Sequence, residues 1–186
     1  MKRACVVLFA LMMFFTLVAC GSGSILPTLG PTPTPEPVGY TLSNPAPLGT
    51  TITVTSSLPE DEQILSLTTG ALLTGDEAIA KYNEIAYYAL WVPVDGKDLI
   101  LIEFTIKLDE SANNEDFEAN LYAFEVYSGE ERLYDDANVS THIIDRPELT
   151  EGEQGTTWLA FMVDKDDEKP VLRYNYFSDD AWFALY

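Results

Sequence analysis

The sequence has few of the residues on which catalytic and metal sites usually depend. It contains two cysteines, Cys5 and Cys20, and a single histidine, His142, among 186 residues. It also has no Gly-x-Ser-x-Gly nucleophile elbow and no glycine-rich phosphate loop. Such a chain cannot build a multi-histidine metal site, and beyond Cys20 it has no thiol and no disulfide. We therefore expect a body held by its hydrophobic core alone, with no cofactor, no metal site and no enzymatic activity.

Basic residues are also scarce. The chain has 10 lysines and arginines against 30 aspartates and glutamates, which gives a formal net charge of -20. A surface of this sign repels the phosphate backbone, so we expect no nucleic-acid partner. It repels anionic lipid headgroups as well, so attachment to a membrane would have to come from a lipid anchor.

The longest apolar run lies at the N-terminus and is shorter than the ~20 residues that a membrane-spanning helix needs. Lys2 and Arg3 precede it, and residues 6–18 are apolar apart from Thr16. A basic start followed by a short apolar stretch is typical of a secretory signal peptide. We predict that residues 1–19 are this signal peptide. An uncleaved membrane anchor is the alternative.

The apolar run ends in Leu17-Val18-Ala19-Cys20, followed by Gly21 and Ser22. This sequence resembles the lipobox of bacterial lipoprotein signal peptides. The resemblance implies that Cys20 becomes the first residue of the mature protein and carries a lipid on its thiol. The protein would then be anchored to the cell membrane on its extracytoplasmic face. The sequence leaves open whether that membrane is the inner or the outer one.

Residues 20–47 differ in composition from the rest of the chain, because they contain seven of its 11 prolines. Alternating proline and threonine remove hydrogen-bond donors and favour an extended polyproline conformation. We predict a linker over this range, either a stalk that lifts a domain from the membrane or a connector of no particular length. The remaining residues 48–186 have the size of one domain.

Alternation of apolar and polar residues dominates residues 48–186. The clearest case is residues 99–108, where Ile102, Phe104 and Ile106 share one face while Glu103 and Thr105 share the other. Similar patterns predict strands at 50–55, 64–73, 121–127, 132–134, 156–163, 171–177 and 181–186. A short helix is predicted at 75–83, with Thr74 as its cap. The fold class is therefore all-β, a β-sandwich of seven or eight antiparallel strands with one short helix.

Several short segments follow one another in the order of the predicted elements. They are Gly49-Thr50-Thr51-Ile52-Thr53-Val54 after the linker, Gly75-Asp76-Glu77-Ala78, Pro93-Val94-Asp95-Gly96-Lys97-Asp98-Leu99-Ile100-Leu101-Ile102, Glu151-Gly152-Glu153 before Trp158-Leu159-Ala160-Phe161, and Trp182-Phe183-Ala184-Leu185. Together these segments resemble an uncharacterised family of bacterial lipoprotein domains with a telokin-like, immunoglobulin-type fold. The resemblance covers nearly all of residues 48–186. It implies an immunoglobulin-like fold and an extracytoplasmic location, and it implies no chemistry.

Aromatic and acidic residues are the candidates for a binding site. Tyr87, Tyr88 and Trp91 cluster where alternation fails, and exposed rings can stack on sugars or anchor a protein partner. Closing one end of the core is their alternative role. The turns at 164–168 and 113–116 are rich in acidic and amide side chains. These side chains could bind calcium, or they could simply be solvated. They lack the spacing of a calcium loop, so we expect only weak, diffuse calcium binding.

The leading hypothesis is a membrane-anchored lipoprotein whose non-catalytic, immunoglobulin-like domain binds a protein or a cell-envelope component. A carbohydrate-binding module that uses exposed aromatic residues is the first alternative. A hydrolase that uses two of the many acidic residues is the second, although no pair stands out. The sequence identifies neither the partner nor the oligomeric state.

Overall fold

A computed structural model describes residues 35–56, 62–87, 93–135, 137–140 and 146–186. Residues 36–186 form one compact unit. Cys20, Tyr88, Trp91 and His142 lie outside the described residues. The described elements are β1 (Thr51–Thr55), β2 (Gln63–Thr74), α2 (Gly75–Ile85), β3 (Lys97–Ser111), β4 (Phe117–Glu118), the 3₁₀ turn η1 (Leu121–Ala123), β5 (Phe124–Tyr127), β6 (Glu148–Leu149), β7 (Gln154–Asp164), β8 (Val171–Tyr174) and β9 (Ala181–Ala184).

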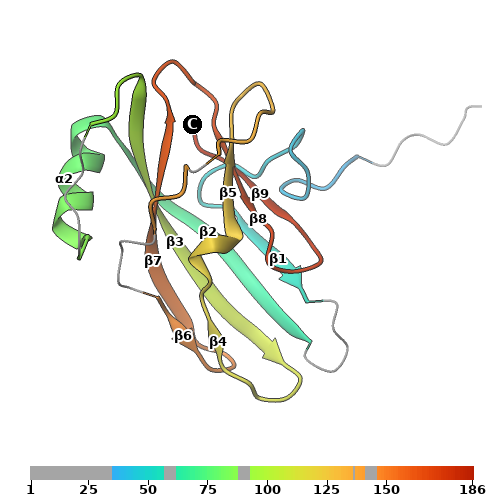
Figure 1. Cartoon of the computed structure of the whole chain (residues 1–186). Coiled ribbons are helices and arrows are strands. Elements are labelled where there is room, and N and C mark those ends of the chain that lie inside the picture. The colour runs from blue at the N-terminus through green and yellow to red at the C-terminus, as the bar shows by residue number, and fades with distance from the viewer. Residues whose placement is uncertain (1–34, 57–61, 88–92, 136, 141–145) are drawn as a thin grey trace, which may run out of the picture. The chain divides into compact units, whose positions relative to one another are not determined.

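The strands form antiparallel sheets that enclose a common core, as an immunoglobulin-like β-sandwich requires (Figure 1). One sheet has the order β1-β2-β3-β7, the second has the order β5-β8-β9, and β4 pairs with β6. The predicted fold class is confirmed. The described residues form nine strands rather than seven or eight, because β4 and β6 have two residues each and are too short to show alternation.

Two of the predicted strands differ from the structure. Residues 121–123 form η1, so the strand predicted at 121–127 begins only at Phe124. The strand predicted at 132–134 is reduced to one isolated bridge between Leu133 and Tyr127. In both places a turn interrupts the chain within a few residues, which a pattern of period two does not reveal.

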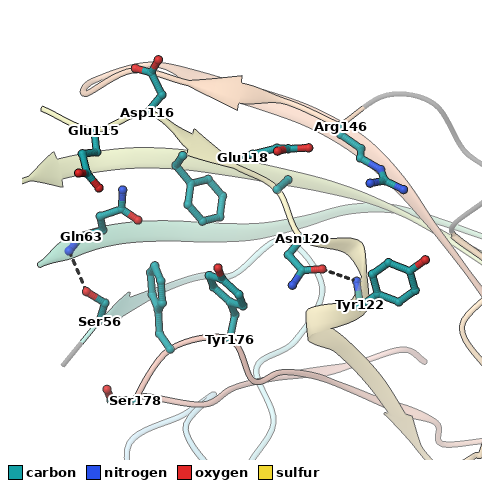
Figure 2. A pocket seen from close by; sticks show the side chains of 13 residues that line it. Ser56, Gln63, Glu115, Asp116, Glu118, Asn120, Tyr122, Arg146, Tyr176 and Ser178 are labelled. Carbon is teal, nitrogen blue, oxygen red and sulfur yellow. Dashed lines mark hydrogen bonds between the residues drawn. The ribbon is translucent and has the colours of Figure 1, made fainter. Parts of the chain in front are cut away.

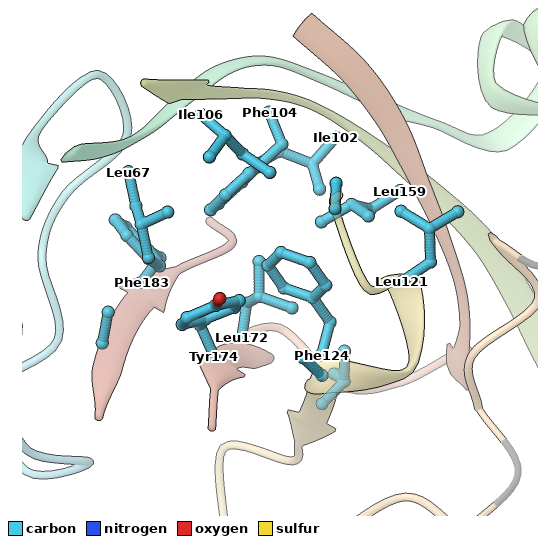
Figure 3. Close-up of a cluster of buried hydrophobic side chains, with 14 of the residues drawn as sticks. Leu67, Ile102, Phe104, Ile106, Leu121, Phe124, Leu159, Leu172, Tyr174 and Phe183 are labelled. Atoms are coloured by element: carbon cyan, nitrogen blue, oxygen red, sulfur yellow. The ribbon is translucent and has the colours of Figure 1, made fainter. Parts of the chain in front are cut away.

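The main core lies between the two larger sheets and is centred on β3 (Figure 3). Phe104 is fully buried, and its ring meets those of Phe124 and Phe183 edge-on at centroid distances of 4.9 and 5.6 Å. Edge-on contacts of this kind are a favoured geometry for aromatic pairs. Leu172 and Leu159, from β8 and β7, are also fully buried in this cluster. The inward face predicted for β3 is therefore confirmed.

A second, smaller core lies on the outer face of the four-stranded sheet, where α2 covers one end of β3. Ala78 and Tyr82 of the helix pack against Leu99, Leu101 and Ala160. This explains why β3 is apolar on both faces at its start and on one face afterwards. The predicted helix is confirmed and extends to Ile85. Its N-cap residue is Thr74, but the predicted side-chain cap is wrong, since the side chain makes no capping hydrogen bond.

Residues 36–47, within the range predicted as linker, belong to the compact unit. The buried Ala46 donates its backbone N–H to the carbonyl of Trp182 and accepts a bond from Ala184 N–H, both at 2.8 Å. Gly39, at φ +87°, lies so close to Ile52 that a Cβ at this position would collide with the Ile52 side chain. The chain before β1 thus closes the edge of β9.

Candidate functional site

An open groove of about 980 Å³ lies at the end of the body where β4 is found (Figure 2). Segments far apart in the sequence form it: the ends of β1 and β2, the chain from β4 to η1, and the connection between β8 and β9. The lining residues are Ser56, Gln63, Glu115, Asp116, Phe117, Glu118, Ala119, Asn120, Tyr122, Arg146, Tyr176, Phe177 and Ser178.

Aromatic packing holds the two walls of this groove. Phe117 of β4 is buried, and its ring lies 6.2 Å from that of Phe177 on the opposite wall. Phe177 in turn packs edge-on against Tyr174 in the main core, again at 6.2 Å. The ring of Tyr176 packs at a tilt against that of Phe177, with the ring centroids 5.5 Å apart, and Tyr176 is 52% exposed. The floor is therefore fixed by the core, while the ring of Tyr176 faces solvent.

Tyr122 is the second exposed ring of the groove. The Asn120 side chain accepts a 3.0 Å hydrogen bond from the backbone N–H of Tyr122 and so caps η1. This turn places Tyr122 outward, with 69% of its surface exposed. The alternation in the strand predicted at 121–127 places Tyr122 on the same side as Phe124 and Val126. That placement is wrong, because the 3₁₀ turn breaks the alternation.

The charged side chains of the groove have no partner among the described residues. Glu115, Asp116 and Glu118 are exposed, and their carboxylates make no ion pair or hydrogen bond within the described part of the chain. The guanidinium of Arg146 is likewise unpaired there. Glu118 stands directly opposite Glu148 in the β4–β6 pair, and like charges in this position are destabilising. Unpaired hydrogen-bonding groups and exposed rings thus converge on one hollow.

Two acidic residues at the opposite end of β3, Asp164 and Asp167, are engaged within the protein instead. Asp164 binds Lys97 and, at 2.6 Å, Arg132, and the hydrogen bonds from these two cations lower the pKa of Asp164. Asp167 accepts hydrogen bonds from the Tyr134 hydroxyl at 2.8 Å and from the N–H of Gly129. Burial, with the Asp167 bond, raises the pKa of Tyr134. Two acids of the turn suggested as a calcium site are therefore bound by groups from other parts of the protein.

No group of three or more metal-ligating side chains lies close enough to hold a metal ion within the described ranges. The described residues also include no helix long and apolar enough to cross a membrane. The side chain of Asn138 donates hydrogen bonds to the backbone carbonyls of Leu121 and Phe124, at 2.7 and 3.1 Å. Its role in this structure is to fasten a loop to η1.

The structure does not bring the predicted aromatic site residues into this groove. Tyr87 follows α2, is 64% exposed, and is not among the lining residues. Tyr88, Trp91 and the lipidation residue Cys20 lie outside the described residues. Tyr122 and Tyr176 were missed because alternation predicted strands over 121–127 and 171–177, and neither tyrosine stands out within such a strand. Only the turn at 113–116 was singled out beforehand, and its last two residues do line the groove.

Comparison with known proteins supports the fold. No family model and no curated protein matches this chain. The solved structure of MPT63, a secreted protein from Mycobacterium tuberculosis, matches with a TM-score of 0.51 and 16% identity, over 75% of this chain and 97% of that one. The body has the fold of MPT63. At this identity the likeness extends to the fold alone.

Two further solved structures are less similar. The yjhA protein from Bacillus subtilis gives a TM-score of 0.49 at 13% identity, over 75% of this chain and 98% of its own. An uncharacterised β-sandwich protein from Clostridium difficile gives 0.43 at 11% identity, over 83% of this chain and 100% of its own. Neither likeness is close enough to bear on function.

Proposed function

We propose that this chain is an extracytoplasmic lipoprotein, anchored through a lipid on Cys20, whose immunoglobulin-like body binds a protein or another cell-envelope component. Binding takes place in the groove between β4 and the β8–β9 connection and leaves the ligand chemically unchanged. The signal-like N-terminus and the lipobox-like Leu17-Val18-Ala19-Cys20 support the anchor. The proline-rich segment after them supports display of the body at a distance from the membrane.

The observation that carries the binding proposal is the coincidence of concavity, exposed aromatic rings and unpaired polar groups. Tyr122 and Tyr176 offer large contact area at a small cost in conformational entropy. The Gln63 amide and the Arg146 guanidinium make no side-chain bond within the described part of the chain, so they are available to a ligand. A hollow lined in this way is the usual form of a recognition site.

The exposure of the carboxyl groups favours binding over hydrolysis. A two-carboxylate hydrolase keeps one acid in an apolar, water-poor pocket so that it can donate a proton. Glu115, Asp116 and Glu118 are all exposed at the rim of an open groove. Exposed carboxylates in this position can attract a ligand. They lack the enclosure that raises the pKa of a catalytic acid.

A carbohydrate ligand is the second candidate. Tyr122 and Tyr176 both lie in the groove, and tyrosine rings can stack on the faces of sugars, with amides and carboxylates bonding the hydroxyl groups. The same lining residues would therefore serve a glycan.

Paired tyrosine variants test the groove itself. The variant Tyr122→Ala/Tyr176→Ala should lose retention of the envelope ligand by at least about tenfold, whereas Tyr87→Ala should retain it. Binding is measured with immobilised full chain against solubilised envelope fractions and, in parallel, against a glycan array. Loss on the array as well as in the fractions identifies a carbohydrate. Equal retention by the groove variant and the wild type would place the binding site elsewhere.

The anchor is tested separately. Cys20→Ser removes the thiol that would carry the lipid, so the chain should accumulate unprocessed and fail to incorporate radiolabelled fatty acid. Cys5→Ser removes the other cysteine and is the matched control, which should be processed and labelled normally. Normal labelling of the Cys20→Ser chain would refute the lipid anchor and leave the groove proposal untouched.

A further inference from the structure

We propose that the ligand of the groove is a cationic polypeptide segment, extended along the acidic face around β4 and β6 and carrying spaced lysine or arginine residues. This inference rests on the proposed function, because it names the class of partner for the same groove. Four features support it: the charge of the lining, the like-charged pair beside it, the acidic hollow next to it, and the spacing of the carboxylates.

The lining itself carries an excess of negative charge. The lining includes three unpaired carboxylates, those of Glu115, Asp116 and Glu118, and a single guanidinium, that of Arg146 (Figure 2). Some acids elsewhere in the body are paired with internal cations, as Asp180 is with Arg173 at 2.8 Å. A surface whose charges have no internal partner is complementary to a partner of opposite sign.

The pair of Glu118 and Glu148 strengthens this point. Both are exposed, and they stand directly opposite each other in the short β4–β6 sheet. This pairing costs stability when the protein is alone, since like charges in opposed positions repel. A bound cation between them would remove the repulsion, so binding of a cationic group is favoured twice over, by attraction and by relief of repulsion.

A second hollow extends the acidic face along the ends of β2 and β3. This cavity of about 460 Å³ is lined by several acids, among them Glu62, Glu110 and Glu151. Lys107 at its edge is already paired with Asp109. Arg146 is therefore the one cation among the described residues of this end that is left unpaired. At the other end of β3, by contrast, Lys97 accompanies the Asp164 turn.

The carboxylates are too dispersed for a metal ion and suited to a polymer. No three of them come together as metal ligands in the described ranges, so a single small cation cannot engage them at once. A polypeptide with repeated cationic side chains can engage several of these carboxylates at once. Tyr122 and Tyr176 add ring faces for these cations, an interaction that the protein itself uses where Arg132 lies 5.0 Å from the Tyr134 ring.

A polypeptide fits the remaining groups of the groove better than a polyamine does. The amides of Gln63 and Asn120 and the guanidinium of Arg146 can donate to backbone carbonyls. A simple polyamine has no carbonyl to accept these bonds. A peptide supplies carbonyls and cations alternately, and its extended form follows an open groove.

Binding of synthetic peptides to the full chain in neutral detergent tests the inference. A peptide that alternates lysine and serine should bind, and its glutamate–serine counterpart should not. The variant Glu115→Gln/Asp116→Asn/Glu118→Gln should weaken binding at least about tenfold, because it removes the three negative charges of the lining. Raising the ionic strength should also weaken binding, since salt screens exposed charges over about 8 Å at physiological concentration.

A charge-matched variant separates this site from the general acidity of the chain. Glu77→Gln/Glu130→Gln/Glu168→Gln removes three exposed charges outside the groove and should change the affinity by less than about threefold. Equal weakening by both triple variants would mean diffuse attraction and would overturn the inference. Tighter binding of a glucosamine oligosaccharide than of the peptide would overturn it in favour of a glycan. In either case, the tyrosine variants decide independently whether the groove is a binding site.

Discussion

Neighbouring side chains on β3 occupy opposite environments. Phe104 is fully buried between the sheets, while the next residue, Thr105, faces outward and exchanges a 3.0 Å hydrogen bond with the hydroxyl of Thr156. On the same outward face, Thr51 and Thr68 are joined in the same way at 2.8 Å. These four threonines form a polar row across the four-stranded sheet. Threonine suits this position because β-branched residues favour strands.

The contrast between these neighbours gives the first prediction. Phe104→Asp should lower the free energy of unfolding by about 4 kcal/mol or more, because it leaves a cavity and buries a carboxylate without a partner. Thr105→Asp should lower it by about 1 kcal/mol, through loss of one exposed hydrogen bond and poorer strand propensity. Urea denaturation of both variants checks the difference. Equal losses would mean that the faces of β3 are assigned wrongly.

Asp109 gives a prediction on pH. Burial raises the pKa of its carboxyl group, but hydrogen bonds from Lys107 and Ser66 outweigh this effect and hold the pKa below its ordinary value. A group with a lowered pKa in the folded state stabilises the protein above its unfolded pKa of about 3.9. This contribution should disappear as the pH falls below that value.

Carbon-13 NMR titration of the carboxyl group measures the effect directly. Asp109 should titrate below about 3.9, and Lys107→Met should raise its pKa towards that value. Glu110→Gln, on the exposed neighbour, should leave the titration nearly unchanged. An unshifted Asp109 in the wild type would show that the bonds from Lys107 and Ser66 are not formed in solution.

At the scale of elements, α2 is held by one apolar face. Tyr82 is 2% exposed against Leu99 and Leu101, and burial raises the pKa of its hydroxyl group. Lys81, on the neighbouring face, forms a 3.2 Å ion pair with the exposed Glu84. An isolated helix of this length is marginal in water, so the helix depends on this contact with the sheet.

Tyr82→Ala should therefore lower the free energy of unfolding by about 3 kcal/mol. Lys81→Ala, the control on the same helix, should cost less than about 1 kcal/mol, since surface ion pairs contribute little. Thermal unfolding followed by circular dichroism compares the two. A Tyr82 variant as stable as the Lys81 variant would mean that the second core contributes nothing to stability.

Long elements could be predicted from the sequence, and short ones could not. β3 and β7 have 15 and 11 residues, enough for alternation to fix both their position and their inward face. β4 and β6 consist of two residues each and depend on pairing with one another. No local sequence pattern predicts such a pairing, because the two strands are about thirty residues apart in the sequence.

The candidate site was largely unpredictable for the same reason. Gln63, Glu115 and Tyr176 belong to three distant segments, and only the folded sheets bring them to one groove. Sequence clustering instead drew attention to Tyr87 and its neighbours. The acidity of the chain indicates the sign of the charge on the proposed partner, but it does not indicate where that partner would bind.

At the scale of the whole molecule, the segment before β1 decides where the folded body begins. Ala46 is completely buried and bonded on both sides to β9, and the N–H of Trp182 donates to the carbonyl of Gly39 at 2.8 Å. Residues 36–47 therefore protect an edge of the β5-β8-β9 sheet that would otherwise be open. Any stalk must lie before this segment.

Truncation tests this boundary. A chain that begins at Glu36 should unfold in a single cooperative transition with a strand-type circular dichroism spectrum. A chain that begins at Leu48 loses Ala46 and its bonds to β9, so its melting temperature should be at least about 5 °C lower. Reducing agent should change neither value, because both chains lack cysteine. Equal melting temperatures would mean that residues 36–47 are dispensable to the sandwich, and a helix-type spectrum from the longer chain would refute the fold itself.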